Sequence, residues 1–304
     1  MKFLGNSWKV VFCICWLLKV SLLYPNNQTS IEKPFVILIA SYNNEKYAEE
    51  NILSAIKQEY SNYRIIFIND CSSDRTLEKV LDTIKKCRAE NRVTVINNQE
   101  RKLGLRNYYE AIVYHTKDEE IVINLDGDDF LANKNVLKVL NKVYSSQKEV
   151  WLTYGQFATL HSKVRGWNAP IPKHVIENND FRSWGDMPTH LRTFYSWLFK
   201  RINLKDLKYG DRFFEMTWDY SFMLPMLEMS GGRFTFINKF LYIYNDSNPI
   251  NDFRVNKPLQ DYYAQYIRGL PKYKPLEHDM FHRCDKGNCI LCNADLKEDV
   301  YVSR

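Results

Sequence analysis

The chain has 304 residues, of which 45% are hydrophobic, 26% charged and 14% aromatic, and its net charge is +6. This length can hold one large domain with a sizeable core, and the composition excludes a disordered or low-complexity chain. The mild positive charge suits an anionic substrate or a lipid surface, but without a clustered basic stripe it argues against nucleic-acid binding.

The first notable segment is apolar and lies within residues 1–30. From Val10 to Tyr24 it is interrupted mainly by Lys19, and it is short for a membrane-spanning helix of about 20 residues. No small-residue cleavage site precedes Pro25, as a secretory signal would require. We therefore favour an uncleaved anchor or interfacial helix and a membrane-associated protein; the alternative is a soluble cytoplasmic protein.

After this segment, buried-strand and helix patterns alternate along the chain. The predicted strands cover residues 35–41, 63–69, 92–96 and 121–125, and the predicted helices cover about 47–59, with Asn44 as a cap, 76–88 and 107–115. Such alternation predicts an α/β fold with a parallel sheet covered by helices on both faces. Ligands of these sheets bind at the carboxyl ends of the strands, where Ser41, Asp70 and Asp126 fall.

The last of these strands ends in the run Asn124-Leu-Asp-Gly-Asp-Asp129. Three carboxylates in four residues repel one another unless a cation neutralises them, and Mg²⁺ or Mn²⁺ prefers such oxygen ligands. The cation would also hold the phosphates of a nucleotide. A solvated acidic turn, with Gly127 making the bend, is the alternative interpretation.

A second feature that suits phosphate is the basic loop at residues 98–107, which contains Arg101, Lys102 and Arg106. Its cations would balance diphosphate charge, although a solvated surface loop explains them about as well. The sequence has no glycine-rich dinucleotide fingerprint after the first strand and no Walker-type phosphate loop. Phosphates would therefore be held by a metal and by side chains.

Four segments in this order resemble family 2 glycosyltransferases, inverting enzymes with the Rossmann-like GT-A fold that use nucleotide-diphosphate sugars. The segments are Ile39-Ala-Ser-Tyr-Asn-Asn44, Asn51-Ile-Leu-Ser-Ala-Ile-Lys-Gln58, Ile68-Asn-Asp-Cys-Ser-Ser-Asp74 and Leu125-Asp-Gly-Asp-Asp129. The resemblance is strong over about residues 34–145 and weaker to about residue 257. It implies a hexosyl- or glycosyltransferase of the EC 2.4 class.

The resemblance also implies which residues bind the nucleotide. It places Ser41 and Asn43 near the nucleotide and Asp70 on the base, where a carboxylate accepts from the imide N–H of uracil, so that UDP is favoured. The chain departs from the family pattern at Asn69, often a second acid, and at Cys71, often glycine.

For the acidic run, the resemblance implies a metal site formed by Asp126 and Asp128. Asp128 is expected to bind Mn²⁺ or Mg²⁺ directly, whereas Asp126 is expected nearer the ribose or sugar. Asp129 is expected to cap the segment that follows. The loop that contains Arg106 is expected beside the donor.

The second half must supply a base for the acceptor hydroxyl, and a carboxylate is the usual choice. The segment Phe213–Glu228 places Glu215 and Asp219 beside a predicted helix, and it resembles the family's acidic position there. We expect Asp219 to be the base, with Glu215 as the second choice. A helix-start acid that interacts with the helix dipole is the alternative interpretation of Asp219.

Another segment of this half, residues 185–194, is similar to a segment in a subset of these transferases. In it, Arg192 is expected to stabilise the departing diphosphate. His190 would bind acceptor or metal, or would be structural. The nearby tryptophans would face a sugar or belong to the core; these are Trp184, Trp197 and Trp218.

The C-terminal segment differs in composition from the rest. It contains His282, Cys284, Cys289 and Cys292, which would complete a tetrahedral Zn²⁺ site. Because only one Cys-x-x-Cys step is present, we rank zinc below a loosely ordered tail or a disulfide.

The sequence therefore predicts three regions: an N-terminal anchor at 1–30, a GT-A domain at 31–257 and a tail at 258–304. Within the domain, residues 31–145 would bind the nucleotide sugar and residues 146–257 the acceptor, a hydroxyl on a glycan, lipid or protein. Two rival hypotheses are a sugar-phosphate nucleotidyltransferase and an inactive nucleotide-sugar-binding module.

Overall fold

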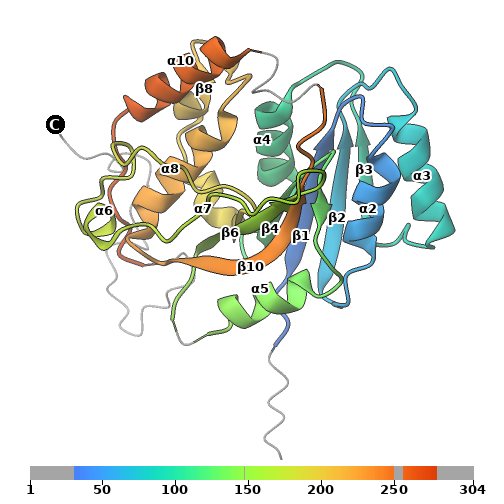
Figure 1. The fold of residues 1–304 in the computed structure, drawn as a ribbon, viewed down its shortest axis with the longest axis horizontal. Helices are drawn as coiled ribbons and strands as arrows, with labels where there is room; N and C mark the ends of the chain where they lie inside the picture. Colours follow the sequence, from blue (N-terminus) through green and yellow to red (C-terminus); the bar gives the residue numbers. More distant parts are fainter. Residues whose placement is uncertain (1–30, 147, 250–255, 279–304) are drawn as a thin grey trace, which may run out of the picture. The chain divides into compact units, whose positions relative to one another are not determined.

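The computed structural model describes residues 31–146, 148–249 and 256–278 (Figure 1). The predicted N-terminal anchor and the C-terminal group of His282, Cys284, Cys289 and Cys292 lie outside these residues. Within the three described ranges, no helix is both long and apolar enough to cross a membrane.

The first half alternates strands and helices, as the sequence predicts. Its elements are β1 (Phe35–Ser41), α2 (Ala48–Ile56), β2 (Tyr63–Asn69), α3 (Thr76–Lys86), β3 (Val93–Asn97), α4 (Gly104–His115) and β4 (Ile121–Asp126). β1 pairs in parallel with both β2 and β4, and β2 pairs in parallel with β3. The carboxyl ends of β1 and β4 are therefore neighbours.

The second half completes an eight-stranded sheet in the order β3-β2-β1-β4-β7-β6-β10-β5. Its strands and helices are β5 (Phe130–Leu131), α5 (Val136–Tyr144), β6 (Leu152–Thr159), α6 (Lys173–Glu177), β7 (Thr193–Tyr195), α7 (Ser196–Lys200), the 3-10 helix η1 (Leu204–Leu207), β8 (Lys208–Tyr209), β9 (Arg212–Phe213), α8 (Trp218–Ser230), β10 (Phe234–Tyr244) and α10 (Lys257–Arg268). β7 runs antiparallel to β4 and β6, and β5 runs antiparallel to β10. The sheet is thus mixed but mostly parallel.

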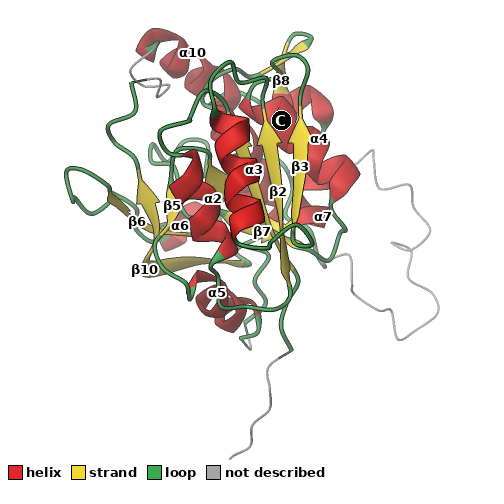
Figure 2. Ribbon diagram, turned by 90° about the vertical axis from the view of Figure 1, so that its right-hand side faces the viewer, coloured by secondary structure: helices red, strands yellow, loops and turns green. Residues whose placement is uncertain are grey.

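Alternation along the central strands builds a core on each face of the sheet. Val36 and Leu38 pack with α4, α7 and α8, whereas Ile37 and Ile39 pack with α2, α3 and α5. Figures 1 and 2 show helices on both sides of the sheet. The predicted α/β fold class with a covered, mostly parallel sheet is confirmed.

Three local features differ from the expectations. α4 begins at Gly104, so Arg106 lies in its first turn and not in a loop. The N-cap of α2 is Tyr47 rather than Asn44, whose side chain bonds to Ser41 instead. The boundary predicted at residue 257 falls at the start of α10, which buries Tyr263 and Ile267 in the core.

Candidate active site

A cavity of about 330 Å³ lies at the carboxyl ends of β1 and β4. Both halves of the domain line it, with the side chains of Tyr42, Asn44, Arg101, Asp126, Asp128, Asp129, His190, Arg192, Trp218, Asp219, Tyr244 and Asn248 among others. Four predicted site residues thus meet in one cavity: Asp126, Asp128, Arg192 and Asp219.

The turn after β4 is pressed against the end of β1, which brings its acids to the cavity. A Cβ on Gly127 would lie 2.6 Å from the side chain of Ser41 and 2.7 Å from the carbonyl oxygen of Ala40. Glycine is required here for close approach. From α2, the buried Asn51 amide donates to the carbonyl oxygens of Asp126 and Asp129 at 2.8 and 2.7 Å.

Asp129 was expected to cap the following segment, but its side chain bonds elsewhere. Its buried carboxylate accepts hydrogen bonds from the Tyr242 hydroxyl and the Asn245 N–H, both at 2.6 Å, and so ties the turn to the end of β10. Burial, and then the neighbouring Asp128 and Asp126, raises the pKa of Asp129 well above its usual range. Negative charge is therefore costly at this position.

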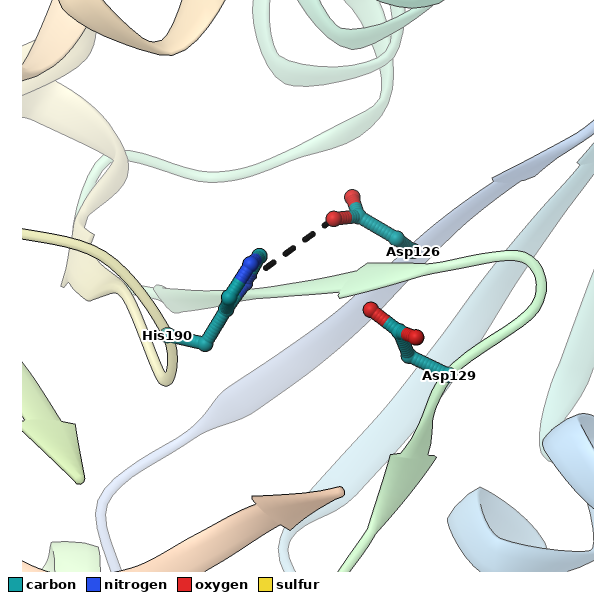
Figure 3. A group of neighbouring side chains, drawn as sticks. All are labelled: Asp126, Asp129 and His190. Atoms are coloured by element: carbon teal, nitrogen blue, oxygen red, sulfur yellow. Dashed lines mark ion pairs between the residues drawn. The ribbon is translucent and has the colours of Figure 1, made fainter. Parts of the chain in front are cut away.

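Three side chains at the cavity come close enough to share a cation, as Figure 3 shows for Asp126, Asp129 and His190. Each offers an atom within 4.8 Å of the others, and Nδ1 of His190 lies 3.9 Å from a carboxylate oxygen of Asp126. The expected pair was Asp126 and Asp128. Asp126 is common to both sets, and Asp128, which accepts from Asn248 at 2.6 Å, lines the same cavity. The donor set thus fits a divalent cation.

His190 is held as a neutral imidazole. Its ring stacks on Tyr242 with centroids 4.4 Å apart and on Tyr244 at 5.5 Å, and it meets the edge of Phe157. Burial, and then the charge of Arg192, lowers the pKa of His190 well below its usual range. A neutral imidazole is the form that binds metals.

Arg192 links the two halves of the domain across the cavity. Its buried guanidinium donates to the Asn124 side chain of β4 at 2.9 Å and to the Asp219 carboxylate of α8 at 2.8 Å. Burial opposes its charge, but Asp219 and Asp126 outweigh it and raise the pKa of Arg192. A permanent cation therefore stands beside the acidic turn.

Asp219 lies in the first turn of α8, at the cavity. The preceding Trp218 fixes this helix end, because its ring lies 5.0 Å from that of Tyr108 and directly over Gly104. Glu215, the second-choice base, forms a 3.7 Å ion pair with Arg212 and is absent from the described cavity lining. Geometry thus favours Asp219 over Glu215.

Asp70 organises the loop before α4. Its buried carboxylate accepts from the Asn98 side chain at 2.9 Å and from the N–H groups of Lys102 and Leu103 at 2.8 and 2.9 Å. These bonds give Asp70 a structural role that needs no ligand. Its contact with a base stays a prediction.

The remaining predicted nucleotide-binding residues make local contacts. Asn43 accepts from the N–H of Ser73 at 2.9 Å, and Ser41 accepts from Asn44. Arg106 pairs with Glu110 on the outer face of α4 and is not in the described cavity lining. Another cation of the same basic stretch, Arg101, does line the cavity, with its guanidinium 3.8 Å from the ring centroid of Tyr42.

Sequence reasoning gave no individual role to three residues at the site: Asn124, Tyr242 and Asn248. Asn124 is a fully buried amide within an apolar strand, and it donates to the Tyr108 hydroxyl and to Asp126. A lone amide in a buried strand is a signal that could have identified it. The other two residues belong to residues 242–249, a segment that resembles the family's late loop after its last strand, but the resemblance assigned no role to either side chain.

Several known glycosyltransferases are similar in sequence to this chain. An uncharacterized glycosyltransferase of Haemophilus influenzae is 30% identical over 126 residues, which are 40% of this chain and 46% of that protein. Glycosyltransferase GlyG of Streptococcus pneumoniae is 26% identical over 218 residues, covering 68% of this chain and 69% of GlyG. The UDP-Glc:alpha-D-GlcNAc-diphosphoundecaprenol beta-1,3-glucosyltransferase WfgD of Escherichia coli is 26% identical over 152 residues, covering 49% and 55%. The first curated relatives are thus matched over about half of their length or less.

Solved structures show the same fold. The crystal structure of TarS from Staphylococcus aureus superposes with a TM-score of 0.53 at 18% identity, covering 70% of this chain and 60% of that one. TarS in complex with UDP-GlcNAc gives a TM-score of 0.51 at 16% identity, covering 71% and 59%. The family model described as Glycosyl transferase family 2 matches residues 36–207, more than half of the chain. This protein therefore belongs to glycosyl transferase family 2, a family of glycosyltransferases.

Proposed function

We propose that the protein is an inverting, metal-dependent glycosyltransferase that moves a sugar from a UDP-sugar to an acceptor hydroxyl. The observation that carries the proposal is the shared cavity, in which Asp126 and Asp128 at the end of β4 face the same space as Asp219 of α8. A single displacement needs a cation for the leaving diphosphate and a base for the acceptor, and this cavity contains candidates for both.

In this proposal, Asp126 and Asp128 hold Mn²⁺ or Mg²⁺, with His190 and Asp129 as further neighbours of the ion. When bound, the ion neutralises charge that develops on the leaving diphosphate. Arg192 adds a fixed positive charge beside Asp126. Arg101 lines the cavity beside Tyr42.

Asp219 acts as the general base. One of its oxygens accepts from Arg192 at 2.8 Å, which fixes the orientation of the carboxylate. The acceptor hydroxyl attacks the anomeric carbon as Asp219 takes its proton, the bond to the diphosphate breaks, and the configuration at that carbon inverts. Arg192 is thus a positioning residue for Asp219.

Support for UDP comes from three sources of different kinds. Asp70 fits the family's base-binding carboxylate, TarS has been crystallised with UDP-GlcNAc, and WfgD is named for a UDP-Glc donor. WfgD is also named for a diphosphoundecaprenol-linked acceptor, and TarS is named for poly(ribitol-phosphate). We therefore propose a hydroxyl on a glycan, lipid or protein as acceptor, with the N-terminal segment as a membrane anchor.

Calorimetry with UDP, GDP and dTDP, each with Mn²⁺ and with EDTA, tests the donor. We expect UDP to bind most tightly and to lose affinity in EDTA; equal affinity for all three would contradict the assignment of uracil as the nucleotide base.

Proton NMR of the freshly released or transferred sugar tests the mechanism. We expect inverted anomeric configuration, whereas retention would overturn the single-displacement reaction. Release of pyrophosphate from a nucleoside triphosphate plus a sugar phosphate would indicate a nucleotidyltransferase instead.

A further inference from the structure

A basic and aromatic surface lies on the loop after β6 and the neighbouring part of β10. We call it the β6–β10 patch, and it consists of Lys163, Val164, Arg165, Trp167, Lys239 and Phe240, all of which are exposed. Trp167 is 69% exposed, Val164 57% and Phe240 45%. Large apolar side chains that gather on a surface mark an interaction site, whereas single ones need no explanation.

Two contacts join the loop after β6 to β10. The guanidinium of Arg165 lies 5.8 Å from the ring centroid of Phe240, and it donates a hydrogen bond to the side chain of Asn238. In β10 the pairing with β6 shifts register on either side of Phe240. Such a bulge turns neighbouring residues of a strand to the same side, which explains why Asn238, Lys239 and Phe240 are all exposed.

The loop that carries most of the patch is firmly attached to the domain. A Cβ on Gly166 would lie 2.3 Å from the ring of Phe157, so the backbone presses directly on that ring. Trp167 packs edge-on against Phe157 with centroids 5.0 Å apart. At its start, the loop donates two backbone N–H groups to the carboxylate of Asp246. The exposure of Trp167 is therefore built into the fold.

The charge of the patch has one sign. Residues 160–170 and 235–244 contain no aspartate or glutamate, and they contribute Lys163, Arg165 and Lys239. The acid in contact with the loop, Asp246, already accepts from the backbone. Tryptophan and phenylalanine flanked by lysine and arginine suit the boundary of a bilayer, where rings enter the headgroup region and cations pair with anionic lipids.

The patch adjoins the candidate active site through one side chain. Phe157 contacts Trp167 on one side and the rings of His190 and Tyr244 on the other, and both of those line the cavity. We propose that the β6–β10 patch docks the domain on a bilayer that carries anionic headgroups, so that the cavity lies next to the lipid surface. The docking is independent of the transferase reaction proposed above, and it does not need the N-terminal segment.

Flotation of the full chain with vesicles of phosphatidylcholine, with and without phosphatidylglycerol, tests the proposal. We expect preference for the anionic vesicles. Replacing the lysines, Lys163→Gln with Lys239→Gln, should weaken that partition about 25-fold, since each surface cation contributes about fivefold. Replacing the rings, Trp167→Ser with Phe240→Ser, should weaken partition into both kinds of vesicle.

Control positions outside the patch are available on α4 and α3. Tyr114 is 70% exposed, and Lys85 and Lys86 are exposed on α3. Tyr114→Ser and Lys85→Gln with Lys86→Gln should partition like the wild type. Because the N-terminal segment could bind vesicles by itself, hydrogen exchange on the vesicle-bound wild-type chain reports the location directly. We expect added protection at residues 160–168 and 238–241, and less of it in the patch variants; bound wild-type protein without this protection would overturn the proposal.

Discussion

The two halves of this domain contribute to one cavity in different ways. In the first half, consecutive parallel strands place Ser41, Asp70 and Asp126 at one edge of the sheet by topology alone. In the second half, Arg192 and Asp219 arrive on short or distant elements and are fixed by contacts back to the first half, such as the bond from Arg192 to Asn124. Regular structure thus positions the acids that we propose for the donor, whereas long-range contacts position the proposed base.

The largest loss of activity is expected from a change confined to the first half of the domain. Asp128→Asn removes a proposed metal ligand, and it should lower metal-dependent release of nucleoside diphosphate by at least about 100-fold. Asp118→Asn is the control, because Asp118 is a partly exposed partner of Lys200 and is not in the described cavity lining. Turnover by Asp128→Asn that equals the control would remove the metal role from this residue.

A comparable loss should follow from changing the second half alone. Asp219→Asn should cut turnover about 100-fold or more and leave UDP affinity unchanged, because a base acts in the transition state and does not hold the nucleotide. Glu215→Gln should keep nearly full turnover, since Glu215 is not in the described cavity lining. Steady-state kinetics with calorimetry on both variants checks this, and the opposite order of effects would make Glu215 the base.

Arg192 links the two halves of the domain. We expect its replacement to lower turnover less than replacement of Asp128 or Asp219. Arg192→Lys keeps a positive charge but cannot reach Asn124 and Asp219 at once, because lysine lacks the planar fork. We expect kcat to fall about tenfold with little change in KM. A fall in UDP affinity without a fall in kcat would instead assign Arg192 to the donor and leave Asp219 unsupported.

The close approach of β4 to β1 can be tested as a change in stability. Gly127→Ala places a methyl group 2.7 Å from the Ala40 carbonyl oxygen, so it should lower the free energy of unfolding by about 1–3 kcal/mol. Urea denaturation measures this difference. Gly210→Ala is an informative comparison, because a Cβ there meets nothing within 4 Å, although its φ of +61° adds some backbone strain. A larger loss at Gly210 would mean that backbone conformation outweighs the packing at Gly127.

The smallest effect concerns the pH dependence of stability. Since the pKa of His190 is lowered in the folded protein, the unfolded chain binds a proton more readily. Stability from this residue is therefore complete above the unfolded pKa of about 6.5 and falls as pH drops below it, by at most about 1.4 kcal/mol per pH unit. Urea denaturation between neutral and mildly acidic pH should show a shallower loss for His190→Gln than for the wild type. Equal slopes would show that His190 is not held neutral.

The same contrast between the halves explains what the sequence could predict. Apolar runs ending in polar residues located β1, β2 and β4, and chain order then placed their ends together. The end of α4 was predicted, but its start was missed because Gly104 is a poor helix former that here makes room for Trp218.

Other site features depended on partners far away in the chain. Asp129 was expected to be a local cap, but its partners Tyr242 and Asn245 follow more than a hundred residues later. Arg106 was chosen from a basic stretch without knowledge of its helical turn, and Arg101 of the same stretch lines the cavity instead. Local patterns cannot identify such contacts.

Release of nucleoside diphosphate by the full wild-type chain, from a panel of UDP-, GDP- and dTDP-sugars with Mn²⁺ or with EDTA, tests the central claim most directly. Slow hydrolysis without an acceptor is sufficient to detect. We predict release from a UDP-sugar that depends on Mn²⁺ and stops in EDTA. Release that is equal in EDTA, or no release together with no binding of any donor, would contradict the proposed use of this cavity.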